Sequence, residues 1–531
     1  MATSVSQKTP AFANVRANVV INLIRTLTMT VLSFLTYPYI TRALGDQAFG
    51  LYSWANAFVY YFLVLAKISI PNIAIRECAK AKSDKQKLFN LVQTFFLLQA
   101  ITTLVSFSLM SGIVLSVPQL FQTRELIYLL SINFLCGAFS FEWVYIALEK
   151  HFYITVRSIS LLALGAVLTF LFIKRSDTPA ILEQEIYLYA AITISYTVFT
   201  SLLNSLILPR HISFKKTHPY QIRPLIKPLL LLFLISFALT LYNQTDQFLL
   251  GLLDESKASV GSYSVGVKGV DIVITLITSL YAVFLPRATH YYSMENKTFY
   301  RNLLRYSFNI TLFIAVPAVA TMSTMARPIT SLISGSGDLL SSSSSYRDAD
   351  WILVALSCMM LTYSLGDNVY NEILLPQKKE RHYLYAMLFG VSCNIGLSLL
   401  FALLPFQDRP GIGVALATGI TDVLLCAYLL IISREYSRRA LFNPNSLKII
   451  VAGILVGIAS FFLCPFLQSR FLDLGLVAWE ASLFSLIATV AIDALVYVLF
   501  LLICKEKLVC SFLPKQRKRR EENEQSQPQG K

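Results

Sequence analysis

An arginine and two asparagines lie in an apolar stretch near the start of the sequence. Asn18, Asn22 and Arg25 are spaced by four and then three residues, so a helix would carry all three on one face. If this stretch crosses a bilayer, a charge at its centre costs about 2.5–3.5 kcal/mol unless it faces a bundle interior or a wet cavity. We therefore predict that this face points inward, where a guanidinium could clamp a phosphate group.

A second set of charges occurs in the middle of the chain. Lys268 and Asp271 are three residues apart and could pair with each other on one helix face, which would make them purely structural. Asp246 lies on the preceding apolar stretch, and we predict that it joins them in one charged cluster. The two sets together would line a cavity suited to an anionic head group. No spacing typical of a metal site or of a catalytic constellation occurs, so we predict neither a metal nor a cofactor, and no catalytic residue.

Composition identifies the elements that must position these residues. The 531 residues are 55% hydrophobic and only 14% charged, whereas a soluble domain carries about 25% charged residues. The chain is therefore expected to be a polytopic, all-α membrane protein. Its net charge of +15 is better explained by basic cytoplasmic loops facing anionic lipid than by nucleic acid, which we exclude as a partner.

Fourteen apolar stretches have about the 20 residues that a helix needs to cross a bilayer. The predicted spans are 18–41, 47–70, 88–117, 126–148, 158–173, 186–208, 229–252, 262–285, 306–333, 351–375, 383–405, 411–433, 449–468 and 480–504. With a cytoplasmic N-terminus, most of the 45 Lys and Arg fall in cytoplasmic segments, as the positive-inside rule requires. We therefore predict that both termini are cytoplasmic.

Few charged residues remain inside these spans. The basic ones are Arg25, Lys67 and Lys268, and the acidic ones are Glu142, Asp246, Asp271, Asp367, Glu372, Asp422 and Asp493. Lys67, Glu372 and Asp271 lie near span ends, where a side chain can reach the interface, so a purely structural role stays open for these three residues.

A weak internal repeat divides the chain into halves. The segments "RALGDQAFGLYSWA" (42–55) and "FLLGLLDESKASVGSYSVG" (248–266) share Leu-Gly, a polar turn and then Gly-x-Tyr-Ser. An even number of spans per half would make the halves parallel repeats. The predicted parts are a cytoplasmic N-terminus (1–17), an N-lobe (18–208), a linker (209–228), a C-lobe (229–433), two extra spans (449–504) and a basic tail (505–531).

Three patches of sequence resemble a known family. The segments "YPYITRALGDQAFGLYSWANAFVYYFLVLAKISIPNIAIRE" (37–77), "TDQFLLG" (245–251) with "YSVGVKGVDIVITLITSLYAVFLPRATHYYS" (263–293), and "LPQKKERHYLYAMLFGVSCNIGLSLLFALLPFQDRPGIGVALATGITDVL" (375–424) resemble the bacterial O-antigen and capsule oligosaccharide flippases. These belong to one superfamily with the MATE multidrug exporters and the lipid II flippase.

The resemblance implies a V-shaped pair of six-helix lobes, and alternating access in the cytoplasmic membrane of a bacterium. It implies transport of an undecaprenyl-diphosphate-linked oligosaccharide to the outer leaflet. Lys268 and Asp271 match an Arg and an acid of the lipid II flippase, and that Arg is thought to meet the diphosphate. Because position 268 carries a lysine, it cannot make the two parallel hydrogen bonds that an arginine makes with a phosphate. A polymerase and other polysaccharide assembly proteins are further candidate partners, beside membrane lipid.

Two other functions stay open. A cation-coupled drug exporter would share the fold, although the embedded acids usual in the first lobe of such exporters are missing apart from Glu142. A polysaccharide polymerase would also handle lipid-linked glycans. It normally needs a large outer loop or a catalytic constellation, whereas the outer segments here are short and lack His, so we predict that the protein is not an enzyme.

Overall fold

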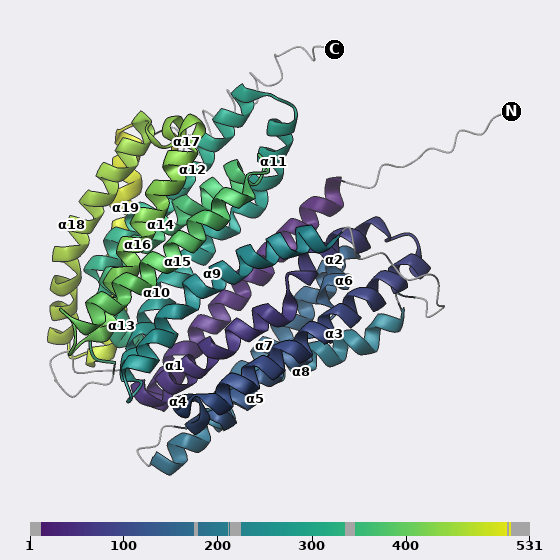
Figure 1. Cartoon of the computed structure of the whole chain (residues 1–531). Helices are drawn as coiled ribbons and strands as arrows, with labels where there is room; N and C mark the ends of the chain where they lie inside the picture. The colour runs from purple at the N-terminus through teal and green to yellow at the C-terminus, as the bar shows by residue number, and fades with distance from the viewer. Residues whose placement is uncertain are drawn as a thin grey trace. The chain divides into compact units, whose positions relative to one another are not determined.

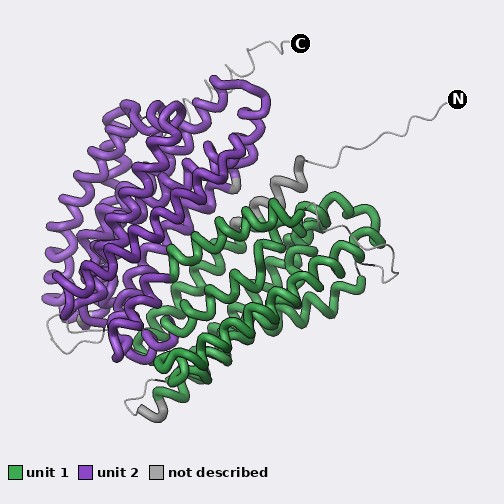
Figure 2. Tube along the Cα trace, in the orientation of Figure 1, with its two compact units in different colours: residues 1–44, 54–244 green, residues 45–53, 245–531 purple. Residues whose placement is uncertain are grey.

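The predicted all-helical membrane fold is confirmed. The structure, a computed structural model, describes residues 12–174, 179–210, 212, 225–334, 346–506 and 509–510. Helices connected by short turns make up these residues, and no strand occurs among them (Figure 1). The chain forms two compact units (Figure 2). Unit 1 holds residues 1–44 and 54–244, and unit 2 holds residues 45–53 and 245–531.

Unit 1 contains the first half of the helices. After most of α1 (Phe12–Lys67), its elements are α2 (Ile70–Lys80), α3 (Lys85–Ser116), α4 (Pro118–Gln122), α5 (Arg124–Gly137), α6 (Glu142–Ala147), α7 (His151–Phe172), α8 (Pro179–Ile207), the turn η1 (Leu208–Arg210) and most of α9 (Ile226–Leu253). Asp84 caps α3 by accepting hydrogen bonds from the backbone N–H groups of Gln86 (2.9 Å) and Lys87 (3.1 Å). These bonds favour the carboxylate and lower the pKa of Asp84.

An apolar core lies where α2, α3 and α6 meet. Phe95 of α3 is fully buried and meets Trp143 of α6 edge to face, with ring centroids 5.9 Å apart. Ile70 of α2 and Tyr145 of α6 are buried in the same cluster. This packing fixes α6, and therefore Glu142 in its first turn.

Unit 2 contains the second half of the helices. Its elements are the end of α9, α10 (Ala258–Ser279), α11 (Tyr281–Ser293), α12 (Lys297–Thr324), α13 (Ala326–Ser334), α14 (Ala349–Val369), the π-helical turn η3 (Tyr370–Leu374), α15 (Glu380–Leu403), α16 (Pro410–Ile432), α17 (Arg434–Leu441), α18 (Pro444–Asp473) and α19 (Ala478–Ile503). The centre of this unit is formed by α10, α14 and α16, which pack against one another. Helices α18 and α19 pack together, and α18 lies against α12.

The two glycines matched by the sequence repeat meet in the structure. A Cβ on Gly50 would lie 1.9 Å from the backbone oxygen of Lys257, and a Cβ on Gly261 would lie 2.2 Å from that of Asp46. Each glycine therefore faces the residue four positions before the other, and only a hydrogen atom fits at either point. This crossing of α1 and α10 places residues 45–53 of α1 in unit 2.

The number of membrane helices agrees with about fourteen spans. In the part of the chain that the structure describes, thirteen helices are long and apolar enough to cross a membrane. The first of them is long enough for the first two predicted spans. It is interrupted at Gly45, whose φ of 74° and ψ of 175° suit glycine.

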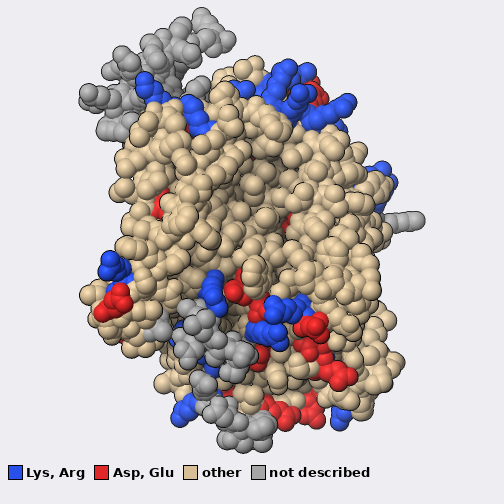
Figure 3. All heavy atoms as spheres, turned by 90° about the vertical axis from the view of Figure 1, so that its left-hand side faces the viewer, with Lys and Arg blue, Asp and Glu red and all other residues tan. Residues whose placement is uncertain are grey.

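Charged side chains are concentrated at the two ends of the face drawn in Figure 3. The band between these ends is almost free of Lys, Arg, Asp and Glu, as contact with hydrocarbon requires. Basic groups dominate one end, whereas the opposite end mixes both signs.

Several predicted segments fall mainly outside the described residues. These are the N-terminus (1–17), the inter-lobe linker (209–228) and the tail (505–531). The lobe boundaries predicted from the sequence stay a prediction.

Candidate functional site

The first predicted set of residues forms a polar cluster in unit 1. Arg25 donates from Nη2 to Oδ1 of Asn22 (3.0 Å) and pairs through Nη1 with Oε1 of Glu142 (3.4 Å). The Arg25 and Glu142 side chains are 23% and 32% exposed, so a ligand could reach both. Asn18 begins the same helical face, but its side chain is outside the described part of the structure.

A break between α5 and α6 positions Glu142. Phe141 takes a left-handed φ of 43°, and this conformation restarts the helix at Glu142. Side chains of α8 satisfy the carbonyl groups that the break frees, as a membrane interior requires. The Ser201 hydroxyl donates to Cys136 O (2.7 Å), and Asn204 Nδ2 donates to Ser140 O (2.5 Å).

A buried arginine completes the cluster. The predicted span 158–173 begins one residue after Arg157. The structure instead begins α7 at His151 and buries Arg157, whose side chain is 2% exposed. Its Nη2 pairs with Oε2 of Glu142 (3.1 Å), and its Nη1 donates to Oδ1 of Asn204 (2.7 Å).

A signal for this arginine was present in the sequence. The predicted span 158–173 is shorter than the roughly 20 residues that cross a bilayer. Extending it toward the N-terminus would have included Arg157. The side chains around Arg157 come from three helices, α6, α7 and α8, which lie side by side in unit 1 (Figure 1).

The cluster carries a positive excess. Glu142 is the carboxylate that pairs with both Arg25 and Arg157, and it also interacts electrostatically with Lys67 at the end of α1. Two arginines therefore contact one carboxylate, and one lysine interacts with it electrostatically. Arg157 is buried against Glu142 and Asn204, whereas Arg25 is partly exposed and Lys67 is exposed. The accessible side of the cluster is thus cationic and can attract an anion such as a diphosphate.

The residues of the second predicted set make two kinds of contact. Lys268 and Asp271 interact electrostatically on α10, where Lys268 is half-buried and Asp271 is exposed. Asp246 instead accepts hydrogen bonds at Oδ2 from the hydroxyls of Tyr263 (2.5 Å) and Thr418 (2.8 Å).

Buried oxygen atoms converge around Asp246. Asn394 donates from Nδ2 to the Thr418 hydroxyl (3.1 Å). Among the described residues, Oδ1 of Asp246 and Oδ1 of Asn394 are buried and have no hydrogen-bond partner. A carboxylate with neutral oxygen donors from α9, α15 and α16 is a suitable ligand set for a hard cation. Sequence reasoning missed Asn394 and Thr418, because single uncharged polar residues in apolar helices carry no distinct signal.

A bundle of membrane-spanning helices that holds ionised groups in its interior is the architecture of a membrane transporter. The chain belongs to the family described as "Polysaccharide biosynthesis protein", whose profile matches residues 15–292. A second family profile, described as "MatE", matches residues 232–400.

Individual relatives agree with this placement. A curated relative from Escherichia coli (strain K12), named "Putative O-antigen transporter", is 24% identical over 151 residues, which cover 28% of this chain and 36% of that protein. The solved structure of "Lipid II flippase MurJ, inward closed conformation" matches with a TM-score of 0.66 at 16% identity, over 92% of this chain and all of that one.

A multidrug resistance MATE family transporter of the MOP superfamily, solved in an inward-facing conformation, matches with a TM-score of 0.57 at 15% identity, over 80% of this chain and 99% of that one. By their descriptions, these relatives are a putative O-antigen transporter, a lipid II flippase and a multidrug transporter.

Proposed function

We propose that this protein is a flippase for a polyprenyl-diphosphate-linked oligosaccharide, most simply an undecaprenyl-diphosphate-linked repeat unit of a capsule, O-antigen or exopolysaccharide. It would move this lipid from the inner to the outer leaflet of a bacterial cytoplasmic membrane by alternating access. The observation that carries the proposal is the cationic cluster of Arg25, Arg157 and Lys67 around Glu142, in a chain of the polysaccharide biosynthesis family.

The exposure of the two arginines suggests how the cluster would bind a diphosphate. Arg157 stays paired with Glu142 inside the bundle and holds that carboxylate in place. Arg25 is accessible and can exchange part of its pairing with Glu142 for the more highly charged diphosphate. Glu142 also competes for Arg25, and this competition favours release once the substrate reaches the other leaflet. Asn18 and Asn22 would position Arg25 from the preceding turns.

Lys268 and Asp271 provide the corresponding pair in the second half. Lys268 would act as a point charge toward the diphosphate or the sugar, and Asp271 would limit how tightly Lys268 binds that group.

Asp246 has a different role in this proposal, because its hydrogen bonds go to Tyr263 and Thr418 rather than to a cationic side chain. The oxygen ligands around Asp246 would hold a monovalent cation or a proton, whose binding drives the conformational change.

A cation-coupled multidrug exporter is the second candidate function. The oxygen site at Asp246 and the match of the MatE profile to residues 232–400 favour it. The two candidates differ in the charge of their substrate, because a cationic drug would be repelled by the positive excess in unit 1.

The first test measures lipid-linked oligosaccharide in cells depleted of this protein, with its leaflet probed by an impermeant glycosidase. A flippase predicts glycosidase-protected material that accumulates on the cytoplasmic side and clears on re-expression. Single repeat units that accumulate on the outer face would instead indicate a polymerase. No accumulation, together with raised drug sensitivity, would support the exporter.

Variants of Arg25 test the cationic cluster. Arg25→Gln removes a charge-assisted contact worth about 1.5–3 kcal/mol, so we expect flipping to fall by roughly tenfold or more. Arg25→Lys keeps the positive charge but loses the planar guanidinium that forms two parallel hydrogen bonds. This variant should retain intermediate flipping activity. Both variants must reach the membrane at the wild-type level. Normal glycan export by Arg25→Gln would exclude Arg25 from the substrate site.

A further inference from the structure

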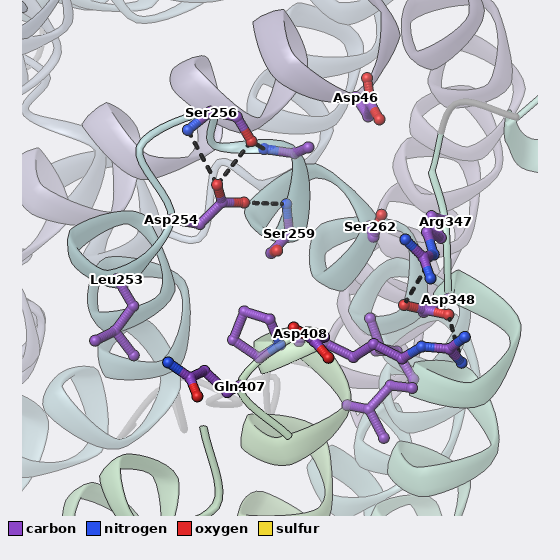
Figure 4. Close-up of a pocket in the computed structure, with 16 residues that line it drawn as sticks. Asp46, Leu253, Asp254, Ser256, Ser259, Ser262, Arg347, Asp348, Gln407 and Asp408 are labelled. Carbon is purple, nitrogen blue, oxygen red and sulfur yellow. Dashed lines mark hydrogen bonds and ion pairs between the residues drawn. The ribbon is translucent and has the colours of Figure 1, made fainter. Parts of the chain in front are cut away.

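A polar pocket of about 330 Å³ lies in unit 2, beside the crossing of α1 and α10 (Figure 4). It is formed where α9 turns into α10, where α15 turns into α16, and just before α14. The start of each of these three helices, at Ala258, Ala349 and Pro410, is therefore at or beside the pocket. In the proposed orientation this is the non-cytoplasmic side of the membrane, where the substrate leaves.

Three of the four aspartates around the pocket already have partners in unit 2. Asp46 accepts a hydrogen bond at Oδ2 from the backbone N–H of Tyr346 (3.3 Å). Asp254 accepts hydrogen bonds from the backbone N–H groups of Ser256 (3.0 Å) and Ser259 (2.8 Å). Burial alone would raise the pKa of Asp254, but these hydrogen bonds outweigh it and lower the pKa. Asp348 pairs with Arg409 at 3.2 Å, which opposes the rise in the pKa of Asp348 that burial causes.

The net charge of the pocket selects against simple ions. Asp46, Asp254, Asp348 and Asp408 bring four negative charges, while Arg347 and Arg409 bring two positive ones. Each helix N-terminus adds a partial charge of roughly +0.5, so the three together offset most of the remaining excess. An anion would meet the carboxylates and a cation would meet the arginines, and neither would gain net attraction.

The groups that stay available alternate between donors and acceptors. Gln407, Asp408 and Arg409 are exposed and occupy consecutive positions in the turn before α16. The Gln407 amide and the Asp408 carboxylate can each form two parallel hydrogen bonds, and the Arg409 guanidinium, which pairs with Asp348 through Nη1, keeps further N–H donors. Leu253 and Pro410 add apolar surface to the lining of the pocket, where the C–H face of a ring could pack.

We propose that this pocket binds the saccharide of the transported lipid on the non-cytoplasmic side. Closely spaced hydroxyl groups satisfy donors and acceptors at once and carry no charge for the pocket to reject. The volume is at the lower end for small-molecule sites and suits a short saccharide. The inference rests on the proposed function, because it assumes that the substrate carries a glycan. It assigns to unit 2 a site that retains the sugar while the diphosphate leaves the cationic cluster.

The test uses the glycan itself. Cells depleted of this protein supply the accumulated lipid-linked oligosaccharide, and mild acid releases its sugar. Binding of this free glycan to the purified full-length protein in nanodiscs is followed by saturation-transfer NMR and by calorimetry. We expect the wild type to bind, and a Gln407→Ala, Asp408→Asn variant to bind at least tenfold more weakly.

The control is Asp473→Asn, which removes an exposed carboxylate at the end of α18 outside the pocket and should bind like the wild type. Thermal unfolding of each variant checks that it is folded. Absence of wild-type binding, equal binding by the pocket variant, or displacement of the glycan by millimolar Ca²⁺ would overturn the saccharide assignment. If depleted cells accumulate no lipid-linked oligosaccharide, the proposed function fails first and this inference fails with it.

Discussion

At the residue scale, the structure distinguishes charges that support the cluster from charges that a ligand can reach. Arg157 and Arg25 share the carboxylate of Glu142, yet only the side chain of Arg25 is appreciably exposed. Burying a cation in a membrane protein is tolerated only where its donors are satisfied. The bonds of Arg157 to Glu142 and Asn204 provide that satisfaction for its two terminal nitrogens.

Arg157→Gln should therefore impair stability more than substrate recognition. Removing one partner of a buried ion pair costs about 3–5 kcal/mol. Because Glu142 is one-third exposed, water will offset part of this loss, and we expect a cost of about 2 kcal/mol after that discount. The measurement is the thermal unfolding midpoint in detergent. Arg76→Gln changes an exposed arginine of α2 and should leave the midpoint unchanged. Equal midpoints for the two variants would contradict the supporting role of Arg157.

At the element scale, the crossing of α1 and α10 depends on the two glycines of the repeat. Their Cα atoms face backbone oxygens at distances that leave no room for a methyl group. The same glycines belong to the weak repeat in the sequence. Their close contact with the opposite backbone explains why both matched positions are glycine. A sequence match in apolar helices was poor evidence, whereas reciprocal close contact is a physical constraint on both positions.

Gly50→Ala should reduce the amount of folded protein. The added methyl would lie 1.9 Å from Lys257 O, which is a backbone atom and cannot rotate away, so α1 and α10 must separate. Gly112→Ala is the matched control, since nothing lies within 4 Å of its added Cβ. That control should be neutral or stabilising, because alanine favours a helix by about 1 kcal/mol over glycine. Fluorescence-detected gel filtration of both variants measures the folded fraction. Wild-type yield and unfolding temperature for Gly50→Ala would show that the crossing tolerates separation.

At the scale of the whole molecule, the distribution of charge implies an orientation. The face in Figure 3 has a basic end and an end of mixed sign, with an uncharged band between them. The positive-inside rule assigns the basic end to the cytoplasm. The pocket lined by Asp254, Asp348 and Asp408 would then open on the opposite side.

Cysteine labelling tests this orientation. In a background without native cysteines, Asp473→Cys at the end of α18 should react with an impermeant maleimide in intact cells. Arg438→Cys on α17 should react only after the membrane is permeabilised. Both positions are exposed in the structure. The reverse pattern would invert the topology and would place the proposed saccharide pocket in the cytoplasm.

The sequence by itself determined the class of fold and the approximate spans, because a membrane interior allows little besides apolar helices. It also identified Arg25, Asn22 and Glu142 as embedded polar residues, since a charge in an apolar run stands out at once. Their joint role in binding substrate stays a prediction.

Only the tertiary structure decided which of these groups meet. It paired Glu142 with Arg157, which lies just before the predicted span 158–173, and it gave Asp246 hydroxyl partners from α10 and α16. The contacts that decide these sites join helices from distant parts of the chain, such as α9 with α16 and α6 with α8. Helical periodicity assigns residues to a face, but the packing of whole helices determines which faces meet.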